Sequence, residues 1–533
     1  MELSDLVGKG YFPHEEIPPA FNTEKLGLKA LEIYNNFENY KNQLSNRKQK
    51  KINKKETLCI QYTVPQVGLK RRIFGIPNPF HQIELSYVIN SNWEFFEDIY
   101  SKSNISASIP IDDPEGKQAI TTKYSFDLFK EKSIEASFNK KFELKMDIAR
   151  YFPSIYTHSI SWAMHGKNFI KQPENRRNYD YVGNLLDAIC SKCQSGQTNG
   201  IPVGPDTSRI IAEMLNCNFD EQLQYKFGDI VGYRFRDDCN FYFSSYSEAE
   251  LVFKCFETML TDYGLNINEE KTTIKKIPYS FESEWSILLS NYKIRSSIQP
   301  LEGKSRLESR KIRISAQRRD IKNFISLSFK LANKNPKKSV IKFAIRKLGY
   351  TKILKKNWDL YEGLIYQMAI KEPVILPDLL KILLRYKNLV NNDKLKKFLI
   401  TIFEEHIYKG HNFEIAWGLW IAKTFSVKIE DDLAKKIIKS QDDISIIIAL
   451  DMINEGLISK SIDLNQLKSE LTEENLFSEH WLLIYESVKK GWLNPVDPDL
   501  LQNSLYFSEL YSEDIEFYDS SRQVDITDFK RSY

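Results

Sequence analysis

The sequence lacks any long apolar run, and its N-terminus lacks the marks of an export signal. The longest apolar stretches, such as residues 444–450, are far shorter than the roughly 20 residues that a membrane helix requires. The opening residues MELSDLVGKGYF contain neither a basic leader nor an apolar core. These absences argue against the membrane-embedded and secreted classes, so we expect a cytoplasmic protein without a membrane partner.

Cysteine is also scarce, with six residues scattered over a chain of 533. Only Cys190 and Cys193 form a close pair, and no second pair or His-x-His cluster completes the four ligands of a structural zinc site. We interpret the pair as reduced thiols on or near a helix, and we predict no zinc ion.

An excess of charge of one sign is missing as well. Lys plus Arg number 75 and Asp plus Glu 71, and the resulting formal charge of +4 is a weak indication of a protein that binds polyanions. Basic residues are concentrated in two segments, 47–55 and 304–319. Such runs are more often solvated faces than nucleic-acid sites, so they do not assign a function by themselves.

The chain is longer than one hydrophobic core usually organises, which predicts two or three domains. Residues 1–135 combine helical pieces with proline-containing turns, which indicates an irregular α/β lobe. In residues 136–300, the strand-like segments 142–148, 231–235 and 239–243 alternate with helical ones. This alternation predicts a mixed sheet with helices packed on one side, an α+β fold.

Beyond about residue 320 the strand pattern disappears and amphipathic helices with a period of 3.6 follow one another. Segments 377–409, 412–440 and 443–470 are each predicted to form two helices joined by a short turn. Their lengths are close to those of helical-hairpin repeats. We therefore predict an all-α, HEAT-like repeat domain over residues 301–533.

Three aspartates stand at the ends of predicted strands. Asp147 follows an apolar strand, and Asp237 and Asp238 lie between two strands in a predicted hairpin turn. Asp is a common turn residue, so turn formation alone would explain the pair. Apolar strands flank the pair on both sides, however, where uncompensated carboxylates are costly unless a cation is bound.

Aspartates arranged in this way suit nucleotidyl transfer. That reaction uses two divalent cations about 4 Å apart, one for the attacking hydroxyl and one for the leaving pyrophosphate. Because Mg²⁺ needs few carboxylates besides phosphate oxygens and water, two or three aspartates on adjacent strand ends suffice. We predict that Asp147, Asp237 and Asp238 bind Mg²⁺ as catalytic ligands, with Mn²⁺ as the alternative ion.

The residues around these aspartates resemble motifs of the reverse transcriptases. DIARYFPSIY at 147–156 is similar to motif A, in which an aromatic five residues after the metal-binding Asp blocks a ribose 2′-hydroxyl. The resemblance gives that role to Phe152 and places Ile148 beside the nucleotide. FRDD at 235–238 is similar to the YxDD box of motif C, with Phe235 in place of the usual Tyr.

Three further segments resemble family motifs. NGIPVGPDTSRIIAEML at 199–215 is similar to motif B, a glycine-rich turn beneath the incoming nucleotide that here contains Gly204. GLNINEEKT at 264–272 is similar to motif D, whose lysine would be Lys271. RRIFGIPNP at 71–79 resembles the fingers motif in which an arginine, here Arg72, contacts the triphosphate.

Five motifs in the family's order imply a right-hand polymerase fold. The fingers would lie in residues 1–135, with further fingers elements around 155–200, and a palm with an antiparallel sheet would lie in 136–300. The sequence also departs from the family. Val203 stands where templated enzymes usually carry a Gln, and residues 81–82 are HQ where a second fingers arginine is usual.

The segments GIPVGP and GYFPHEEIPPAF, together with the helical tail, resemble the bacterial abortive-infection polymerases, the Abi branch of the family. That resemblance implies antiphage defence, a homo-oligomer, and single-stranded DNA synthesis from dNTPs. It also implies priming from a tyrosine of the protein, to which the product stays attached, without a template. Tyr11 is one candidate among 28 tyrosines, so the priming residue stays open.

Two other functions compete with this one. An RNA-templated reverse transcriptase, as in retron or group II intron systems, would use the basic segments to hold a duplex. A non-catalytic scaffold would keep the palm fold only to present the helical repeat to a partner. The complete set of carboxylates argues against the scaffold, because a disused site has no physical reason to keep them clustered.

Overall fold

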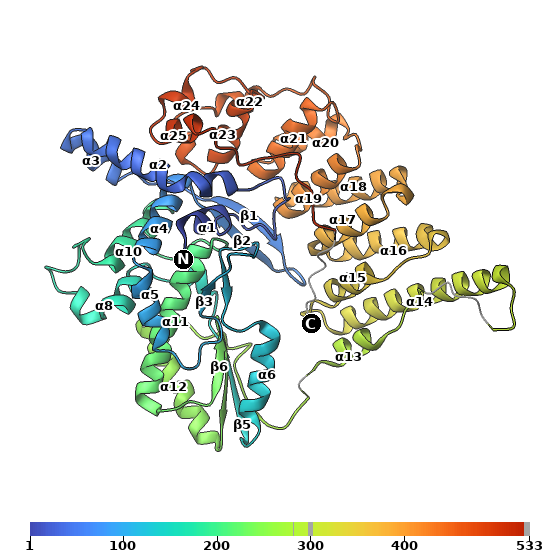
Figure 1. Cartoon of the computed structure of the whole chain (residues 1–533), viewed down its shortest axis with the longest axis horizontal. Helices are drawn as coiled ribbons and strands as arrows, with labels where there is room; N and C mark the ends of the chain where they lie inside the picture. The colour runs from blue at the N-terminus through green and yellow to red at the C-terminus, as the bar shows by residue number, and fades with distance from the viewer. Residues whose placement is uncertain (281, 297–301, 527–533) are drawn as a thin grey trace.

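The computed structural model describes residues 1–280, 282–296 and 302–526. Figure 1 shows a sheet-containing half, drawn in blue to green, and a helical half that runs from yellow to red around it. Among the described residues, no helix combines the length and the apolar character that crossing a bilayer requires.

The N-terminal part contains helices and two small antiparallel hairpins. The first hairpin pairs β1 with β2, and the second pairs β3 with β4. The elements in chain order are α1 (Leu3–Gly8), α2 (Glu24–Gln43), α3 (Asn46–Asn53), β1 (Ile60–Pro65), β2 (Arg71–Ile76), α4 (Pro79–Ser91), α5 (Trp93–Ser101), β3 (Pro110–Asp112), β4 (Ile120–Thr122) and α6 (Phe126–Ser137).

The central sheet has four strands in the order β6-β7-β5-β8, and all neighbours are antiparallel. Its strands are β5 (Phe142–Asp147), β6 (Gly232–Phe235), β7 (Asp238–Phe243) and β8 (Thr273–Lys276). Along β7 the buried Cys239, Phe241 and Phe243 alternate with Asp238, Asn240 and Tyr242, so one face of the strand lies in the core. The antiparallel sheet implied by the family resemblance and the three predicted strand segments are confirmed, whereas the mixed sheet expected from the alternation is not observed and β8 was not predicted.

Helices lie on both sides of this sheet, not on one side as predicted. Helix α12 contacts β5 and β7, whereas α6 contacts β6 and β7, and Figure 1 shows the two helices on opposite sides of the strands. The second layer forms because Phe126 and Phe129 of α6 pack against Phe235 of β6. The helices of this part are α7 (Tyr151–Ser154), α8 (His158–His165), α9 (Lys167–Ile170), α10 (Val182–Lys192), α11 (Asp206–Phe227) and α12 (Tyr246–Asp262).

All elements assigned in the described residues 282–296 and 302–526 are helices, and the prediction of helices beyond about residue 320 is confirmed. Predicted pairs 377–409 and 412–440 each contain two helices, whereas in 443–470 the second helix has only five residues. The helices are α13 (Glu284–Asn291), α14 (Arg306–Lys334), α15 (Val340–Tyr350), η1 (Lys355–Asn357), α16 (Trp358–Lys371), η2 (Pro373–Ile375), α17 (Leu376–Arg385), η3 (Lys387–Leu389), α18 (Asn392–His406), η4 (Ile407–Lys409), α19 (Asn412–Thr424), α20 (Asp431–Ile438), α21 (Asp443–Asn454), α22 (Asn465–Ser469), η5 (Asn475–Phe477), α23 (Trp481–Lys489), α24 (Leu500–Asn503) and α25 (Phe507–Ser512). Their classification as HEAT-like repeats stays a prediction.

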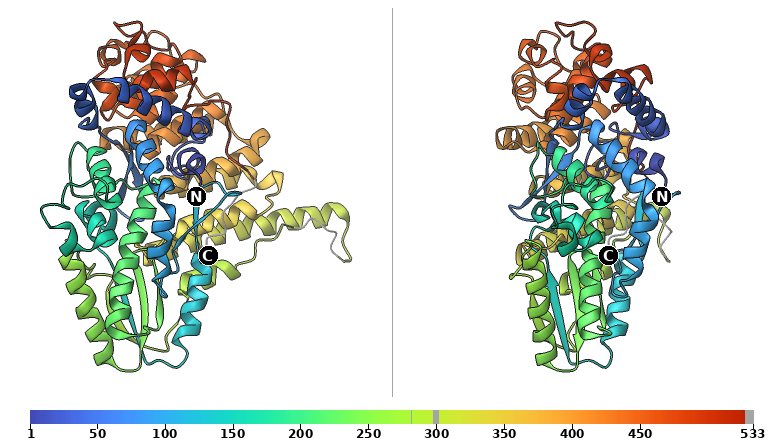
Figure 2. Two further views of the ribbon diagram at one scale, coloured as in Figure 1. Left: turned by 60° about the vertical axis from the view of Figure 1, so that its left-hand side comes forward. Right: turned by 90° about the vertical axis from the view of Figure 1, so that its left-hand side faces the viewer.

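The helical half returns to the N-terminal segment. Helix α25 contacts α2, and Phe21 forms an isolated bridge with Tyr518. One hydrophobic core includes residues of α1, α2, β1 and β2 together with residues from α13 to α25. A second core joins α4 and α5 to the sheet and its helices. Helix α14 extends away from the body in Figure 1 and in the left view of Figure 2.

Candidate active site

Asp147 and Asp238 are direct partners in the ladder between β5 and β7. Opposite residues of an antiparallel pair place their side chains on the same face of the sheet, about 5 Å apart at Cβ. The turn between β6 and β7 consists of two residues, Arg236 and Asp237, directly before Asp238. Arg236 adopts a left-handed conformation with φ of +57°. The predicted hairpin is confirmed, although Asp238 belongs to the strand and only Asp237 to the turn.

Asp147 is held from the segment that resembles motif D. Its side chain is 2% exposed, its Oδ1 accepts a hydrogen bond from Asn268 at 2.7 Å, and its Oδ2 lies 2.5 Å from Nζ of Lys271. The backbone of Asn268 also donates to the Asp147 carbonyl at 2.8 Å. The ammonium of Lys271 therefore neutralises Asp147, and its own side chain is 56% exposed.

The other two carboxylates are held at some electrostatic cost. Burial, followed by the charge of Asp147, raises the pKa of Asp237. Burial, followed by the charge of Asp237, raises the pKa of Asp238 to about 6. Clustered carboxylates with raised pKa values are suited to a divalent cation, since a cation would offset both the lost hydration and the repulsion. The residues present therefore fit the predicted metal.

Ile148 connects the two strands behind this cluster. Its side chain is buried, its backbone N–H donates to the carbonyl of Asp237 at 3.3 Å, and it bridges to Ile267. The predicted metal ligands, Ile148 and Lys271 thus come together at one end of the sheet. In this structure Ile148 fixes the backbone of the site with an inward-facing side chain.

A buried arginine that the sequence analysis did not single out anchors the same hairpin. Arg234 of β6 is 1% exposed and donates to Asp220 from Nε and Nη2 at 2.6–3.1 Å, and to Glu213 from Nη1 and Nη2 at 2.7–3.1 Å. Its Nη1 also donates to the carbonyl of Arg236 at 3.0 Å. Two acids seven residues apart on the buried face of α11 were the signal available in the sequence.

The glycine-rich loop before α11 is tied to the segment after Asp147. Gly200 adopts φ of +90°, and its N–H donates to the carbonyl of Ile155 at 2.8 Å. The N–H of Ile201 donates to the carbonyl of Phe152 at 3.0 Å. These bonds hold the segments resembling motifs A and B beside each other.

Gly204 allows the loop before α11 to pack closely against the β1–β2 hairpin. Its φ is +130°, and a Cβ there would lie 3.2 Å from Cδ1 of Phe74 in β2. The neighbouring Val203 accepts a backbone hydrogen bond from Gly75 at 2.9 Å. The structure therefore gives Gly204 a packing role against β2, and direct contact with a nucleotide stays a prediction.

Phe152 lines a hollow next to the aspartate-bearing turn. The hollow is shallow, because the empty space of about 350 Å³ at its lining includes open solvent. It lies between the β3–β4 hairpin, helix α11 and the β6–β7 turn, and its lining includes Arg209, Glu213, Asn216 and Arg236. A flat apolar ring and two arginines in one hollow match the apolar and anionic parts of a nucleotide.

Cations converge on this side of the site. Desolvation, followed by the charge of Arg209 and that of Arg72, lowers the pKa of Arg236, as expected for a guanidinium group with other cations nearby. Arg72 lies exposed on β2, and its Nε and Nη2 donate to Gln66 at 3.2 Å when the Gln66 amide is oriented with its oxygen toward the guanidinium. Only Arg72 could be identified from the sequence, because Arg209 and Arg236 reach the same hollow only through the fold.

The structure also shows the positions of Tyr11 and of the close cysteine pair. Tyr11 is fully buried, and its hydroxyl donates to the carbonyl of Pro77. Cys190 and Cys193 are buried free thiols, and burial raises the pKa of both. Tyr11 is therefore not presented to the aspartates in this structure.

Comparisons with known proteins agree with this geometry. Residues 107–301 match the family described as reverse transcriptase (RNA-dependent DNA polymerase). The match includes the three aspartates, Phe152 and Lys271 but not Arg72. The chain therefore contains a polymerase domain of the reverse-transcriptase type. No curated protein matches the sequence.

Among solved structures, the chain is similar to two of telomerase from Candida tropicalis. The apo telomerase shares 13% identity with a TM-score of 0.29, over 75% of this chain and 67% of that chain. The telomerase in complex with a TWJ fragment of telomeric RNA shares 11% identity with a TM-score of 0.28, over 74% of this chain and 64% of that chain. This chain thus spans about two thirds of the length of those telomerases.

Proposed function

We propose that the protein is a DNA polymerase of bacterial antiphage defence, which builds single-stranded DNA from dNTPs on one of its own tyrosines without a template. The observation that carries the polymerase activity is the pairing of Asp147 with Asp238 beside Asp237, inside a domain that matches the reverse transcriptases. The defence role, the homo-oligomer and self-priming rest on the sequence resemblance to the abortive-infection branch.

The three aspartates would hold two Mg²⁺ or Mn²⁺ ions, which supply the charge that activates a hydroxyl and stabilises leaving pyrophosphate. The β5–β7 ladder and the Ile148 bond to Asp237 fix the carboxylates before substrate arrives. Preorganisation of this kind lowers the cost of reorganisation during the reaction. Arg234 serves the same purpose through its bond to the Arg236 carbonyl.

Lys271 and the arginines of the hollow supply the positive charge for the triphosphate. The ammonium of Lys271 pairs with Asp147 and is more than half exposed, so it can pass to a phosphate when a cation takes over Asp147. Arg72 and Arg236 extend this positive surface toward the β1–β2 hairpin. The nucleotide would enter with its phosphates on this side and its sugar beside Phe152.

The nature of Val203 supports synthesis without a template. Val203 has no polar group for the hydrogen bond that Gln makes in templated relatives, and its side chain packs against the core. The specificity of the site then rests on the sugar and the phosphates, which all dNTPs share. Tyr11 would have to leave a buried, hydrogen-bonded position to prime, so we favour no particular tyrosine.

An RNA-templated reverse transcriptase is the second candidate, and the exposed basic residues of α3 and α14 favour it. Electrostatic contact with a duplex backbone would suit both helices. A templated enzyme would need an added primer and template.

The test is incorporation of radiolabelled dNTPs by the purified full-length protein with Mg²⁺ or Mn²⁺. Without primer or template, the proposal expects label that stays with the protein through heat and detergent and is removed by nuclease. Label that appears only with a primer and an RNA template selects the second candidate. No incorporation under either condition overturns both.

A further inference from the structure

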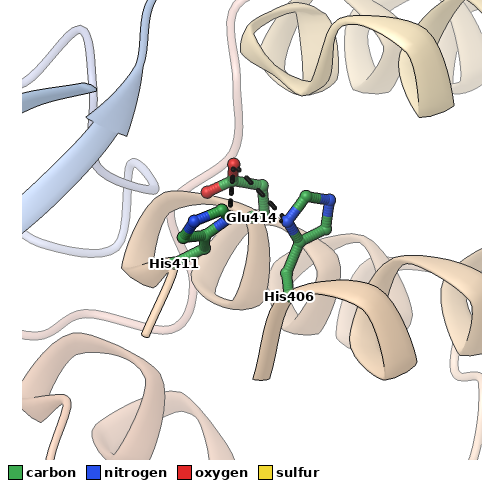
Figure 3. A group of neighbouring side chains, drawn as sticks. All are labelled: His406, His411 and Glu414. Carbon is green, nitrogen blue, oxygen red and sulfur yellow. Dashed lines mark hydrogen bonds and ion pairs between the residues drawn. The ribbon is translucent and has the colours of Figure 1, made fainter. Parts of the chain in front are cut away.

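A group of nitrogen and oxygen donors lies far along the chain from the aspartates, where the helical half meets the β1–β2 hairpin (Figure 3). His406 ends α18, His411 immediately precedes α19, and Glu414 lies in the first turn of α19. The Nδ1 atoms of the two histidines are 2.8 Å apart. The Oε1 atom of Glu414 lies 3.7 Å from Nδ1 of His406 and 3.6 Å from Nδ1 of His411.

These separations are close to those of three ligands on one tetrahedral ion. Zinc bonds of about 2.1 Å place neighbouring tetrahedral donors roughly 3.4 Å apart. Shifts of a few tenths of an ångström in the two imidazole rings would bring the three donors to that spacing. Two imidazoles and one carboxylate, with water in the fourth position, form a donor set that zinc commonly takes.

The side chains are enclosed but reachable. His406 and Glu414 are 6% and 1% exposed, whereas His411 is 21% exposed and offers an entry path. Among the described residues, Nε2 of His406 has no hydrogen-bond partner, so the tautomer with a bare Nδ1 leaves a buried N–H unpaired, a cost that binding of the ion has to offset.

An arginine of the β1–β2 hairpin orients the Glu414 side chain. Arg71 of β2 donates to both carboxylate oxygens at 2.7 Å, and its Nη2 also donates to Thr63 of β1. A carboxylate has about four lone-pair positions, so this fork leaves Oε1 able to bind an ion. A hydrogen-bonded carboxylate is the usual arrangement around a protein-bound metal. Arg71 immediately precedes Arg72, the candidate triphosphate contact.

We propose that His406, His411 and Glu414 form a zinc site that fixes the β1–β2 hairpin to α19 through Arg71. The ion binds Nδ1 of each histidine, Oε1 of Glu414 and one water. One of the two Nδ1 atoms carries the proton of the hydrogen bond between the rings, and that ring changes to the tautomer protonated at Nε2 as the ion binds, so no net proton is released. The site holds the hairpin that carries Arg72 in place, and it is independent of the polymerase activity proposed above.

The test uses the full-length Asp237→Asn protein, so that binding at the palm aspartates is suppressed and polymerase turnover plays no part. After removal of metals by a chelator, calorimetric titration with zinc chloride is expected to give one tight site per chain and a higher melting temperature. His411→Gln is expected to weaken zinc binding at least about 100-fold. The matched control is His158→Gln, since His158 is partly exposed and pairs with Asp187 outside this cluster.

Three outcomes overturn the proposal: no zinc binding, equal binding by the His411→Gln protein, or loss of binding in the His158→Gln control alone. Should His411→Gln fail to fold, Co²⁺ bound to the Asp237→Asn protein decides. Visible absorption of a four-coordinate site, displaced by zinc, supports the proposal. Absence of that absorption shows that the histidines only support the Arg71–Glu414 ion pair.

Discussion

Asp147, the last residue of β5, lies directly opposite Asp238, the first residue of β7. Because this pairing is set by a continuous antiparallel ladder from Phe142 to Asp147, its geometry does not depend on a flexible loop. The carboxylates are therefore fixed at one end of the sheet before any ligand binds, at the electrostatic cost seen in the pKa values of Asp237 and Asp238.

Asp237→Asn removes one charge from this cluster while keeping the side-chain shape. In EDTA we expect an unchanged or higher melting temperature, because burial and repulsion disfavour the charged form of Asp237. Stabilisation by Mg²⁺ with a dNTP should be lost. Differential scanning fluorimetry measures both, with the exposed Asp229→Asn as the control. A clearly lower melting temperature of Asp237→Asn in EDTA would contradict this account of the cluster.

Cation binding should weaken in acid. The pKa of Asp238 is raised to about 6, so protons compete with the cation as the pH falls through that value. In the metal-free protein, pH affects folding stability in the opposite direction. Between the unfolded pKa of about 4 and a folded value of about 6 the native state holds the extra proton, so this group's contribution to stability falls as pH rises. Mn²⁺ titrations by electron paramagnetic resonance should show this loss of cation affinity in acid. A Mn²⁺ affinity that does not change across this pH window would refute it.

Arg234→Met should destabilise the protein by about 3–5 kcal/mol, because Glu213 and Asp220 lose the cation buried between them. Adding Glu213→Gln and Asp220→Asn should restore most of the stability measured by urea unfolding. The triple variant should still incorporate nucleotides more slowly than the wild type at saturating dNTP, because the Arg236 carbonyl keeps only its hydrogen bond from Asn216. Full recovery of kcat would show that Arg234 balances charge without positioning the turn.

Phe152→Ala should relax the choice between deoxyribonucleotides and ribonucleotides. The ring stands in the hollow beside the aspartate-bearing turn, and its removal opens space for a 2′-hydroxyl. We expect the ratio of kcat/KM for dNTP over rNTP to fall about 10-fold or more. Phe152→Tyr is the matched control and should keep the preference. An unchanged ratio in Phe152→Ala would place the sugar elsewhere.

The sequence predicted the parts of the site that depend on local patterns. The strand-like pattern located β5, β6 and β7, and the resemblance to family motifs placed Asp147 with the 237–238 turn. Features that depend on the pairing of distant elements were not predictable. Arg234 reads as an ordinary strand residue until α11 supplies its acids, and Glu414 acquires Arg71 only because α19 packs on the first hairpin.

The helical half shows the same limit. Helix periodicity predicted that the chain beyond residue 320 is helical, yet it gave no sign that this half shares a core with α1, α2 and the first hairpin. Two helical pairs appeared as predicted, whereas 443–470 contains one full helix and a single short turn of another. The left-handed Gly456 follows the end of the first of these, and residues 457–464 then connect it to α22 without regular structure.

The most direct test of the central claim compares nucleotide incorporation by the wild type and by Asp237→Asn, each with Mg²⁺ or Mn²⁺ and all four dNTPs. The account predicts incorporation by the wild type and a loss of at least about 1,000-fold in the folded variant. Equal incorporation by the two proteins would contradict it, because the carboxylates at the end of the β5–β7 ladder would then have no part in the reaction.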